Sequence, residues 1–583
     1  MSKLEVDQID PQSGTTLTLG TSGDTVVVPS GVQLAPGGGL TLTGALVVDG
    51  GTVKLDGNYP TGSSNVALGD GALDDGSLSG NNNTAIGDDA LGENTSGSIN
   101  TAIGGQSLKA NTTGVCNVGV GYATLFDNTT GLQNTAIGSY SLTNNTTANN
   151  NTAVGYNSLL TNTTGANNVA VGSLSGDAIT TGSTNVAIGR GSLGANTTGS
   201  CNVAIGDLAL VAATTVSQNT AIGMLSMTAT TSGIRNTAVG RQSMCANTTG
   251  CCNVAMGSNA LASGTTGDFN VAVGGAALGS VNTGNCNTAI GACAMNTNTS
   301  GANNTAVGKS ALLANTTGTQ NVAIGTLALD ANTSGNELTA MGYNSLGANT
   351  TGCYNVAVGD NALAANTTGN DNTTIGMRSL LNNTTGTNNT GVGRNALREN
   401  TTAANNTAVG SSSLACNTTG ASNVAVGAEA LDANTTGAEN TAVGRFALTS
   451  NTEGDENTAV GRYSLGTNTT GEKNTALGHS TVENNTTGDF NVGIGHAALQ
   501  ANTTADNNTA VGYQSLDANT EGHSNVAVGK GSLSANTSAD ENTAVGFNAL
   551  ADNTTGHSNV AVGACALITN TTSRDNVGLG FCA

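Results

Sequence analysis

A 17-residue repeat that runs without insertion or deletion constrains the fold of this chain more than any other feature. The segment Asn-Thr-Ala-Ile-Gly at residues 83–87 returns at 100–104, and related segments recur as far as Asn576. From Asn83 to Asn576 the chain advances 493 residues, or 29 steps of 17, and an earlier copy begins 18 residues upstream at Asn65. Self-similarity at a fixed short period is the mark of stacked repeat architectures. We therefore expect about thirty equivalent units.

The unit reads Asn-(Thr/Val)-Ala-(Val/Ile)-Gly-x-x-(Ser/Ala)-Leu-x-x-Asn-Thr-Thr-Gly-x-x, and its positions are numbered 1 to 17 below. A Gly directly after Val or Ile in every unit disfavours helix. Seventeen residues suit one coil of a solenoid, with a strand at positions 2–5, a second at about 8–12, and turns between them. One extra residue would flip the side chains that follow it to the other face, so stacked coils demand a strict length. The predicted fold class is all-β, a parallel β-solenoid (β-roll) of about thirty coils.

The recurring Asn residues at positions 1 and 12 predict two ladders of amide side chains, because stacking places equivalent residues about 4.8 Å apart. The first ladders would contain Asn83, Asn100, Asn117 and Asn134 at position 1, and Asn94, Asn111, Asn128 and Asn145 at position 12. N-glycosylation is the competing interpretation, since Asn-Thr-Thr matches the acceptor triplet. We interpret Asn-Thr-Thr-Gly as a turn, because Asn and Gly tolerate left-handed backbone.

Position 3 raises the question of oligomeric state. If the aliphatic residue at position 4 points inward with the Leu at position 9, strand alternation puts position 3 outward. Yet position 3 is always small, with Thr374 the largest residue found there. One interpretation is that the position-3 column lines a subunit interface around a threefold axis, giving a homotrimeric fibre. The other is that position 3 points inward at a tight corner of the coil.

Charge and hydropathy narrow the classes of partner. Fifteen basic residues against 37 acidic ones give a net charge of −22, which opposes binding to nucleic acid. No stretch approaches the 18 or more apolar residues of a membrane span, and the opening residues 1–7 lack the apolar core of a signal peptide. We therefore expect synthesis in a cytoplasm.

We find no catalytic constellation, no cofactor motif and no convincing metal site, so the chain is predicted not to be an enzyme. His479 and His496 occupy one column a single coil apart, which leaves either a surface metal site or two solvated side chains. The acidic groups near the first repeats lack calcium-loop spacing and are interpreted as solvated turn residues. The eleven cysteines show no CxxC spacing and are expected to be free thiols. The cysteines are scattered along the chain: Cys116, Cys201, Cys252 and Cys286 share position 17 of the repeat, while Cys245, Cys293 and Cys416 lie at other positions. The other two histidines, His523 and His557, also lie at variable positions.

Half of each repeat resembles the heads of trimeric autotransporter adhesins. The segment Asn-Val-Ala-Ile-Gly-x-x-Ser-Leu at residues 185–193 is similar to their Ala-Ile-Gly-x-x-Ser motif. That resemblance implies a left-handed parallel β-roll assembled as a trimer. The common repeat of those heads is shorter, however, and the Asn-Thr-Thr-Gly half is additional here.

The whole repeat resembles that of bacteriophage tail and virion fibre proteins, which carry Asn-Thr-Ala-(Val/Leu)-Gly-x-x-Ala-Leu-x-x-Asn-Thr-Thr-Gly units. The opening residues 1–9 and the segment 13–19 are also similar to the starts of such proteins. Many of them end in a self-cleaving chaperone domain, which this sequence lacks. The resemblance implies either that such a domain was removed or that folding proceeds without it.

The repeat region 65–583 follows a different segment, residues 1–64, in which short strands alternate with turns containing Gly and Pro. We interpret 1–64 as an attachment or capping segment, with a disordered tail as the alternative.

The resulting prediction is a structural fibre of a phage tail or virion, a spacer or host-attachment rod. Its expected partners are itself, a virion protein docked on the N-terminal segment, and a host cell surface. The alternative is an adhesin or extracellular filament of a cell. Ice binding is a third, weaker possibility, because the paired Thr at positions 13 and 14 would point to opposite faces.

Overall fold

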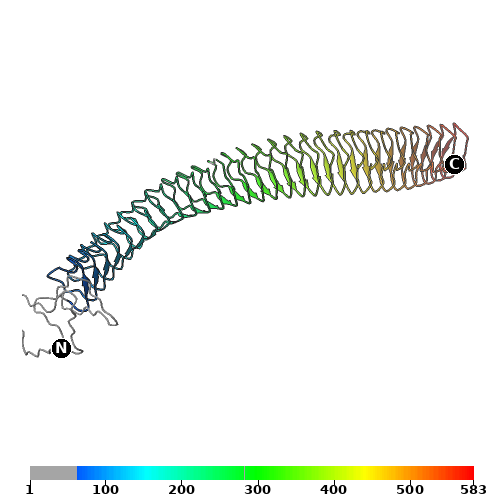
Figure 1. Cartoon of the computed structure of the whole chain (residues 1–583). Coiled ribbons are helices and arrows are strands. Elements are labelled where there is room, and N and C mark those ends of the chain that lie inside the picture. Colours follow the sequence, from blue (N-terminus) through cyan, green and yellow to red (C-terminus); the bar gives the residue numbers. More distant parts are fainter. Residues whose placement is uncertain (1–61, 281–282) are drawn as a thin grey trace, which may run out of the picture. The chain divides into compact units, whose positions relative to one another are not determined.

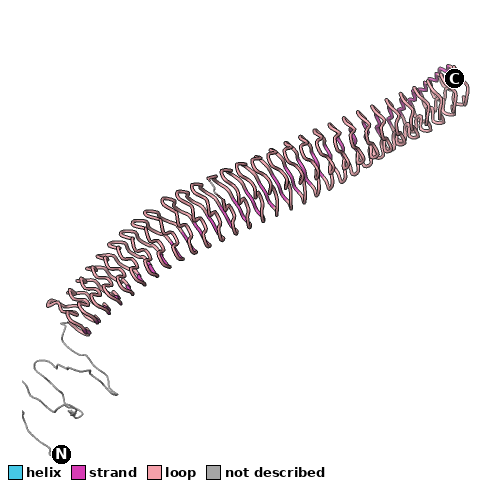
Figure 2. Tube along the Cα trace, turned by 45° about the horizontal axis from the view of Figure 1, so that its top comes forward, coloured by secondary structure: helices cyan, strands magenta, loops and turns pink. Residues whose placement is uncertain are grey.

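The computed structural model describes residues 62–280 and 283–583, and within them the chain forms a parallel β-solenoid (Figures 1 and 2). Each coil contributes one three-residue strand at positions 2–4, and the described residues contain no helix. This confirms the predicted fold class. The predicted strands of the segment 1–64 lie outside the described residues. The strands are β1 (Val66–Leu68), β2 (Thr84–Ile86), β3 (Thr101–Ile103), β4 (Val118–Val120), β5 (Thr135–Ile137), β6 (Thr152–Val154), β7 (Val169–Val171), β8 (Val186–Ile188), β9 (Val203–Ile205), β10 (Thr220–Ile222), β11 (Thr237–Val239), β12 (Val254–Met256), β13 (Val271–Val273), β14 (Thr288–Ile290), β15 (Thr305–Val307), β16 (Val322–Ile324), β17 (Thr339–Met341), β18 (Val356–Val358), β19 (Thr373–Ile375), β20 (Thr390–Val392), β21 (Thr407–Val409), β22 (Val424–Val426), β23 (Thr441–Val443), β24 (Thr458–Val460), β25 (Thr475–Leu477), β26 (Val492–Ile494), β27 (Thr509–Val511), β28 (Val526–Val528), β29 (Thr543–Val545), β30 (Val560–Val562) and β31 (Val577–Leu579).

Every strand pairs in parallel with the strands of the coils before and after it, in exact 17-residue register after the first step. Hydrogen bonds between coils continue beyond the strands. The Leu91 amide donates to the Ser107 carbonyl at 3.0 Å, and the Thr95 amide donates to the Thr112 carbonyl at 3.0 Å. Because strand and turn residues alike bond to the next coil, an inserted residue would break contacts all around the coil. This explains the uninterrupted period.

The predicted second strand at positions 8–12 is wrong, because positions 6–11 form turns instead. Left-handed backbone recurs at positions 7, 9 and 17, as at Asp89 (φ 55°), Leu91 (φ 52°) and Ile99 (φ 61°). Such a conformation bends the chain sharply and prevents an extended strand. The expectation that the Asn and Gly of Asn-Thr-Thr-Gly adopt the left-handed conformation is therefore wrong.

The two recurring glycines are required for different reasons. Gly325, at position 5, has φ +137°, a conformation open to Gly alone, and a Cβ there would lie against the Gly342 carbonyl group. Gly335, at position 15, lacks such a φ, although a Cβ there would also lie against the Gly352 carbonyl oxygen and the Asn332 and Asn349 side chains. This difference explains why Ala replaces Gly at position 15 in some coils, for example at Ala148, and never at position 5.

The interior of the solenoid is built from positions 3, 8 and 9, together with the two Asn columns. Ala306 at position 3 and Leu312 at position 9 are both fully buried, whereas Val307 at position 4 is only partly buried. The assignment of position 4 to the interior is therefore wrong, and so is the interface proposed for the position-3 column. Position 3 points inward, as the alternative held, although from the centre of a strand rather than from a corner.

Both predicted Asn ladders are present. At position 12, the Asn111 side-chain amide donates to Asn94 Oδ1 at 2.7 Å, and Asn128 donates to Asn111 in the same way at 2.8 Å. At position 1 the connection runs mainly through the backbone: the Asn100 amide donates to Asn83 Oδ1 at 2.9 Å, while Asn83 Nδ2 donates to the Gly97 carbonyl at 2.9 Å. These Asn side chains are fully buried. Glycosylation at position 12 is thus incompatible with the folded stack.

Candidate interaction surface

The outward face of the sheet is the most distinctive surface of the described residues. It consists of the position-2 column, Thr or Val, and the position-4 column, which is Val, Ile, Leu or Met in all 31 strands. Ile137 and Ile375, at position 4, are 41% and 47% exposed. We call these two columns the sheet face. An outward column that stays apolar in every coil differs sharply from positions 6, 7, 16 and 17, which vary freely.

The sheet face is large for a surface left in water. Thirty steps of about 4.8 Å and a width of two residues give roughly 1,000 Å². The largest apolar patch on a typical monomer covers about 300–600 Å². A standard protein–protein interface buries about 800 Å² on each partner. The sheet face is therefore long enough to support a stable association.

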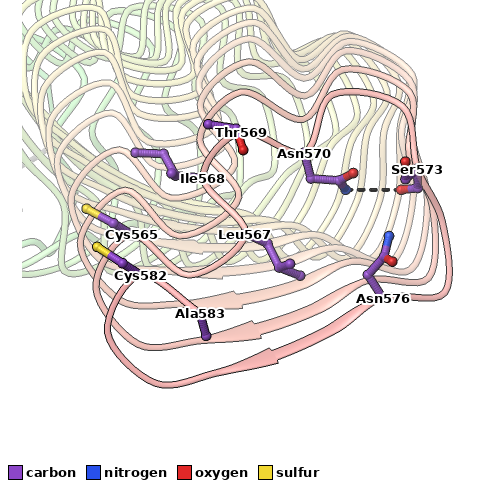
Figure 3. A pocket seen from close by; sticks show the side chains of 9 residues that line it. All are labelled: Cys565, Leu567, Ile568, Thr569, Asn570, Ser573, Asn576, Cys582 and Ala583. Atoms are coloured by element: carbon purple, nitrogen blue, oxygen red, sulfur yellow. Dashed lines mark hydrogen bonds between the residues drawn. The ribbon is translucent and has the colours of Figure 1, made fainter.

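Two edges of different chemistry flank the sheet face. Positions 16 and 17 come just before each strand and positions 6 and 7 just after it, so the two pairs lie at opposite ends of the strands. Figure 3 shows the two ends of β31: Asn576, at position 1, comes directly before the strand, and Cys582, at position 7, lies at the opposite end. Most exposed aromatic side chains lie at positions 6 and 7, among them the edge-to-face pair Tyr122 and Tyr140, whose ring centroids are 5.4 Å apart.

His479 and His496, for which the sequence leaves a surface metal site or two solvated side chains, lie side by side on the surface. His479 and His496 stack face to face, with centroids 5.2 Å apart and planes inclined by 5°, and both side chains are exposed. Tyr463 and Tyr513 extend the row on either side. Among the described residues, no group of three or more His, Cys, Asp or Glu side chains is placed to hold a metal ion. The pair belongs to an aromatic row.

All eleven cysteines lie in the described residues as free thiols, each exposed or partly exposed. Cys565 and Cys582 occupy position 7 of successive coils, with their sulfur atoms side by side (Figure 3). Partial desolvation raises the pKa of the Cys582 thiol, and the adjacent Cys565 raises it further. No other pair of cysteines is separated by 17 residues.

Position 10 holds half-buried acidic side chains. Burial raises the pKa of Asp432, and the Glu429 carboxylate raises it further, while Arg398 opposes the shift. Burial likewise raises the pKa of Asp330 and Asp517 at equivalent positions. These carboxylates are separated along the stack by five or more coils. They do not form the paired arrangement that acid–base chemistry needs.

A hollow of about 390 Å³ opens at the last coil (Figure 3). Its lining includes Leu567, Asn570 and Asn576, which are members of the interior columns at positions 9, 12 and 1. Asn570 Nδ2 donates to the Ser573 carbonyl at 3.0 Å, as its equivalents do along the stack. The hollow is therefore the cross-section of the solenoid, seen where the next coil would stack.

The sequence matches no protein-family model and no curated protein. Residues 62–280 and 283–583 contain no helix at all, and hence no helical segment able to cross a membrane. What the geometry itself defines is a β-solenoid of tandem repeats with a fibre-like build.

Proposed function

We propose that this chain is a structural fibre protein, a phage tail or virion fibre that serves as a rigid spacer or host-attachment rod. The observation that supports the proposal most strongly is the continuous stack of 31 parallel strands in one register. A stack of this kind spans about 140 Å at 4.8 Å per coil. A spacer must be long and rigid. The repeat's resemblance to phage fibre units favours the virion over a cell-surface filament.

We further propose that the fibre is a homotrimer in which the sheet faces of the chains pack together. The sheet face replaces the position-3 column as the proposed interface between chains, because the fold buries position 3 inside each chain. Packing the sheet face against other copies would remove the apolar position-4 column, and the Thr and Val side chains of position 2 beside it, from water along the whole stack. This association is expected to add to the stability that each thin coil obtains from one Leu and two small residues.

Electron microscopy of the purified full-length protein tests the rod and the assembly together. We expect rods of about 140 Å whose mass corresponds to three chains. A matched pair of variants tests the role of the sheet face. Ile137→Lys with Ile375→Lys should give monomers, while Thr147→Lys with Thr385→Lys, at exposed position 14 of the same coils, should leave the assembly intact. Equal behaviour of the two variants would contradict the proposed packing.

Immunogold labelling tests the virion role separately. Antibodies against the solenoid should label isolated phage particles. Label confined to the envelope of intact cells would instead support the alternative, a cell-surface adhesin or filament. The two outcomes are exclusive, and neither depends on the number of chains in the rod.

A further inference from the structure

The two edges of the sheet face carry opposite charge along strands β23 to β29. We call positions 6 and 7 after these strands the cationic edge, and positions 16 and 17 before them the acidic edge. The cationic edge has no carboxylate among its 14 residues, whereas the acidic edge has eight carboxylates and one lysine. The charged and aromatic members of the cationic edge are Arg445, Phe446, Arg462, Tyr463, His479, His496, Tyr513, Lys530 and Phe547; the charged members of the acidic edge are Glu439, Asp455, Glu456, Glu472, Lys473, Asp489, Asp506, Asp540 and Glu541.

The cationic edge is held in place by contacts within it. The Arg445 guanidinium lies 4.3 Å from the centroid of the Phe446 ring, and Arg462 lies 4.6 Å from that of Tyr463. Phe446 and Tyr463 in turn stack at 5.1 Å. Arg445 and Arg462 are nevertheless exposed, and neither guanidinium forms an ion pair within the described residues. Their positive charge therefore stays available to a partner.

The acidic edge is a column of like charges with little local neutralisation. Asp489 Oδ1 accepts a hydrogen bond from the Glu472 amide at 2.7 Å, and Asp506 Oδ1 accepts one from the Asp489 amide at 2.8 Å. Among the described residues, two carboxylates of the edge have a basic partner: Glu456 lies 3.9 Å from Lys473, and Asp506 lies 3.8 Å from His523, which is charged only when protonated. Carboxylates repeated in successive coils repel one another, so cations supplied from outside would stabilise the edge.

Resting on the self-association proposed above, we infer that copies of this chain pack side by side in parallel, with the cationic edge of one copy against the acidic edge of the next. Rotation about an axis parallel to the stack brings these unlike edges together, as in any cyclic assembly. An antiparallel pair would instead place like edges together. Charge complementarity sets the register and orientation of an interface more than its affinity. The sheet face supplies the contact area between copies, and the charged edges favour the parallel orientation over the antiparallel one.

In this arrangement Arg445 of one copy lies level with Glu439 of its neighbour, because both flank β23, and Arg462 lies level with Glu456 beside β24. Two double variants and one quadruple variant of the full-length chain test the pairing. They are Arg445→Glu with Arg462→Glu, Glu439→Lys with Glu456→Lys, and the four changes combined. A control, Lys109→Glu with Arg398→Glu, changes the net charge as much as the first variant does, at position 10, which is away from both edges.

We expect either edge reversal to raise the dissociation constant about tenfold or more in dilute salt, where surface charges are least screened. The combined variant should return to within about threefold of the unmodified chain, and the control should stay within about twofold. Near 1 M salt, where the Debye length is about 3 Å, these differences should vanish. Sedimentation equilibrium gives the dissociation constants, and a gold label on the N-terminus should mark one end of each assembly.

Labels at both ends, a combined variant no tighter than the single reversals, or a control as weak as the reversals would overturn the edge pairing. If every variant associates with unaltered affinity, the sheet-face proposal stands and only the edge pairing is refuted. A chain that is monomeric at every salt concentration removes both. Immunogold labelling of virions still decides the fibre role in each case.

Discussion

Gly325→Ala tests why the glycine at position 5 never varies. The φ of +137° costs a residue with a Cβ about 1–3 kcal/mol. The new methyl group would also lie within 2.7 Å of the Gly342 carbonyl carbon, which can move only if the next coil shifts, at a further cost of about 1–3 kcal/mol. The expected loss of local stability is therefore about 4 kcal/mol, the middle of the summed range.

Native-state hydrogen exchange measures this loss coil by coil, which suits a solenoid whose coils contact mainly their neighbours. The Gly325 and Gly342 amides donate to Val307 and Ile324 carbonyls, each at 2.8 Å, and report on the opening of this region. We expect their exchange to accelerate on the order of 10³-fold, with little change five or more coils away.

Gly335→Ala is the matched control in the same coil. Its backbone needs no positive φ, and alanine stands at position 15 elsewhere, where Asn145 Nδ2 still donates to the Ala148 carbonyl at 3.2 Å. A Cβ at Gly335 would meet the Gly352 carbonyl oxygen, as one at Gly325 would meet that of Gly342, so the two variants differ mainly in φ. We expect exchange to rise about tenfold to a hundredfold, equivalent to about 1–3 kcal/mol. If the two variants accelerated exchange equally, backbone conformation would not be what fixes Gly at position 5.

Four further changes probe the columns, each followed by the same exchange measurement. Asn440→Ala removes a donor to the Gly454 carbonyl and an acceptor for the Asn457 amide. Leaving both backbone groups unpaired should cost about 2–6 kcal/mol, and a loss below about 1 kcal/mol would contradict the ladder. Ala306→Leu overfills the interior and should cost about 1–3 kcal/mol, whereas Val307→Leu on the sheet face should change stability by less than about 0.5 kcal/mol; the reverse order would return position 4 to the interior. The raised pKa of Asp432 means that the folded state loses stability as pH rises through and above the ordinary value of 3.8. Asp432→Asn should therefore stabilise the chain at pH 7 by about a few tenths of a kcal/mol, with no gain below pH 3.8.

The sequence was sufficient to predict the solenoid, its period and both Asn ladders, because a strict 17-residue repeat restricts every coil alike. It was insufficient to assign the faces of the strand. Hydrophobicity alone places Val or Ile at position 4 inside and Ala at position 3 outside, but the buried position 3 holds nothing larger than Thr374, whose hydroxyl donates to the Val356 carbonyl at 3.1 Å. The small residue points inward for lack of space, and the larger one remains outside.

The candidate surface was missed for the same reason, since a column assigned to the interior cannot be considered for binding. The left-handed turns were also missed. Position 9 is Leu in most coils, and Leu rarely adopts a positive φ, yet Leu312 does so at 54°. Its burial and the bond from its amide to the Ala328 carbonyl at 2.9 Å hold it there. Composition carries no signal for such a conformation, which only the stacked neighbours can impose.

The distribution of variability along each coil favours assembly as the role of the sheet face. If that face simply met water, position 4 would be free to become polar, as positions 6 and 7 do on the neighbouring turn. Instead it remains aliphatic or Met in all 31 strands although Ile375 is 47% exposed. An intrinsic strand preference would admit Thr, Tyr or Phe at that position as readily as Val. Thr fills position 2 in many of the same strands, yet it never appears at position 4. Position 4 excludes hydroxyl groups, and both columns of the sheet face exclude aromatic groups, which is what the proposed close packing against a second copy of the same face requires.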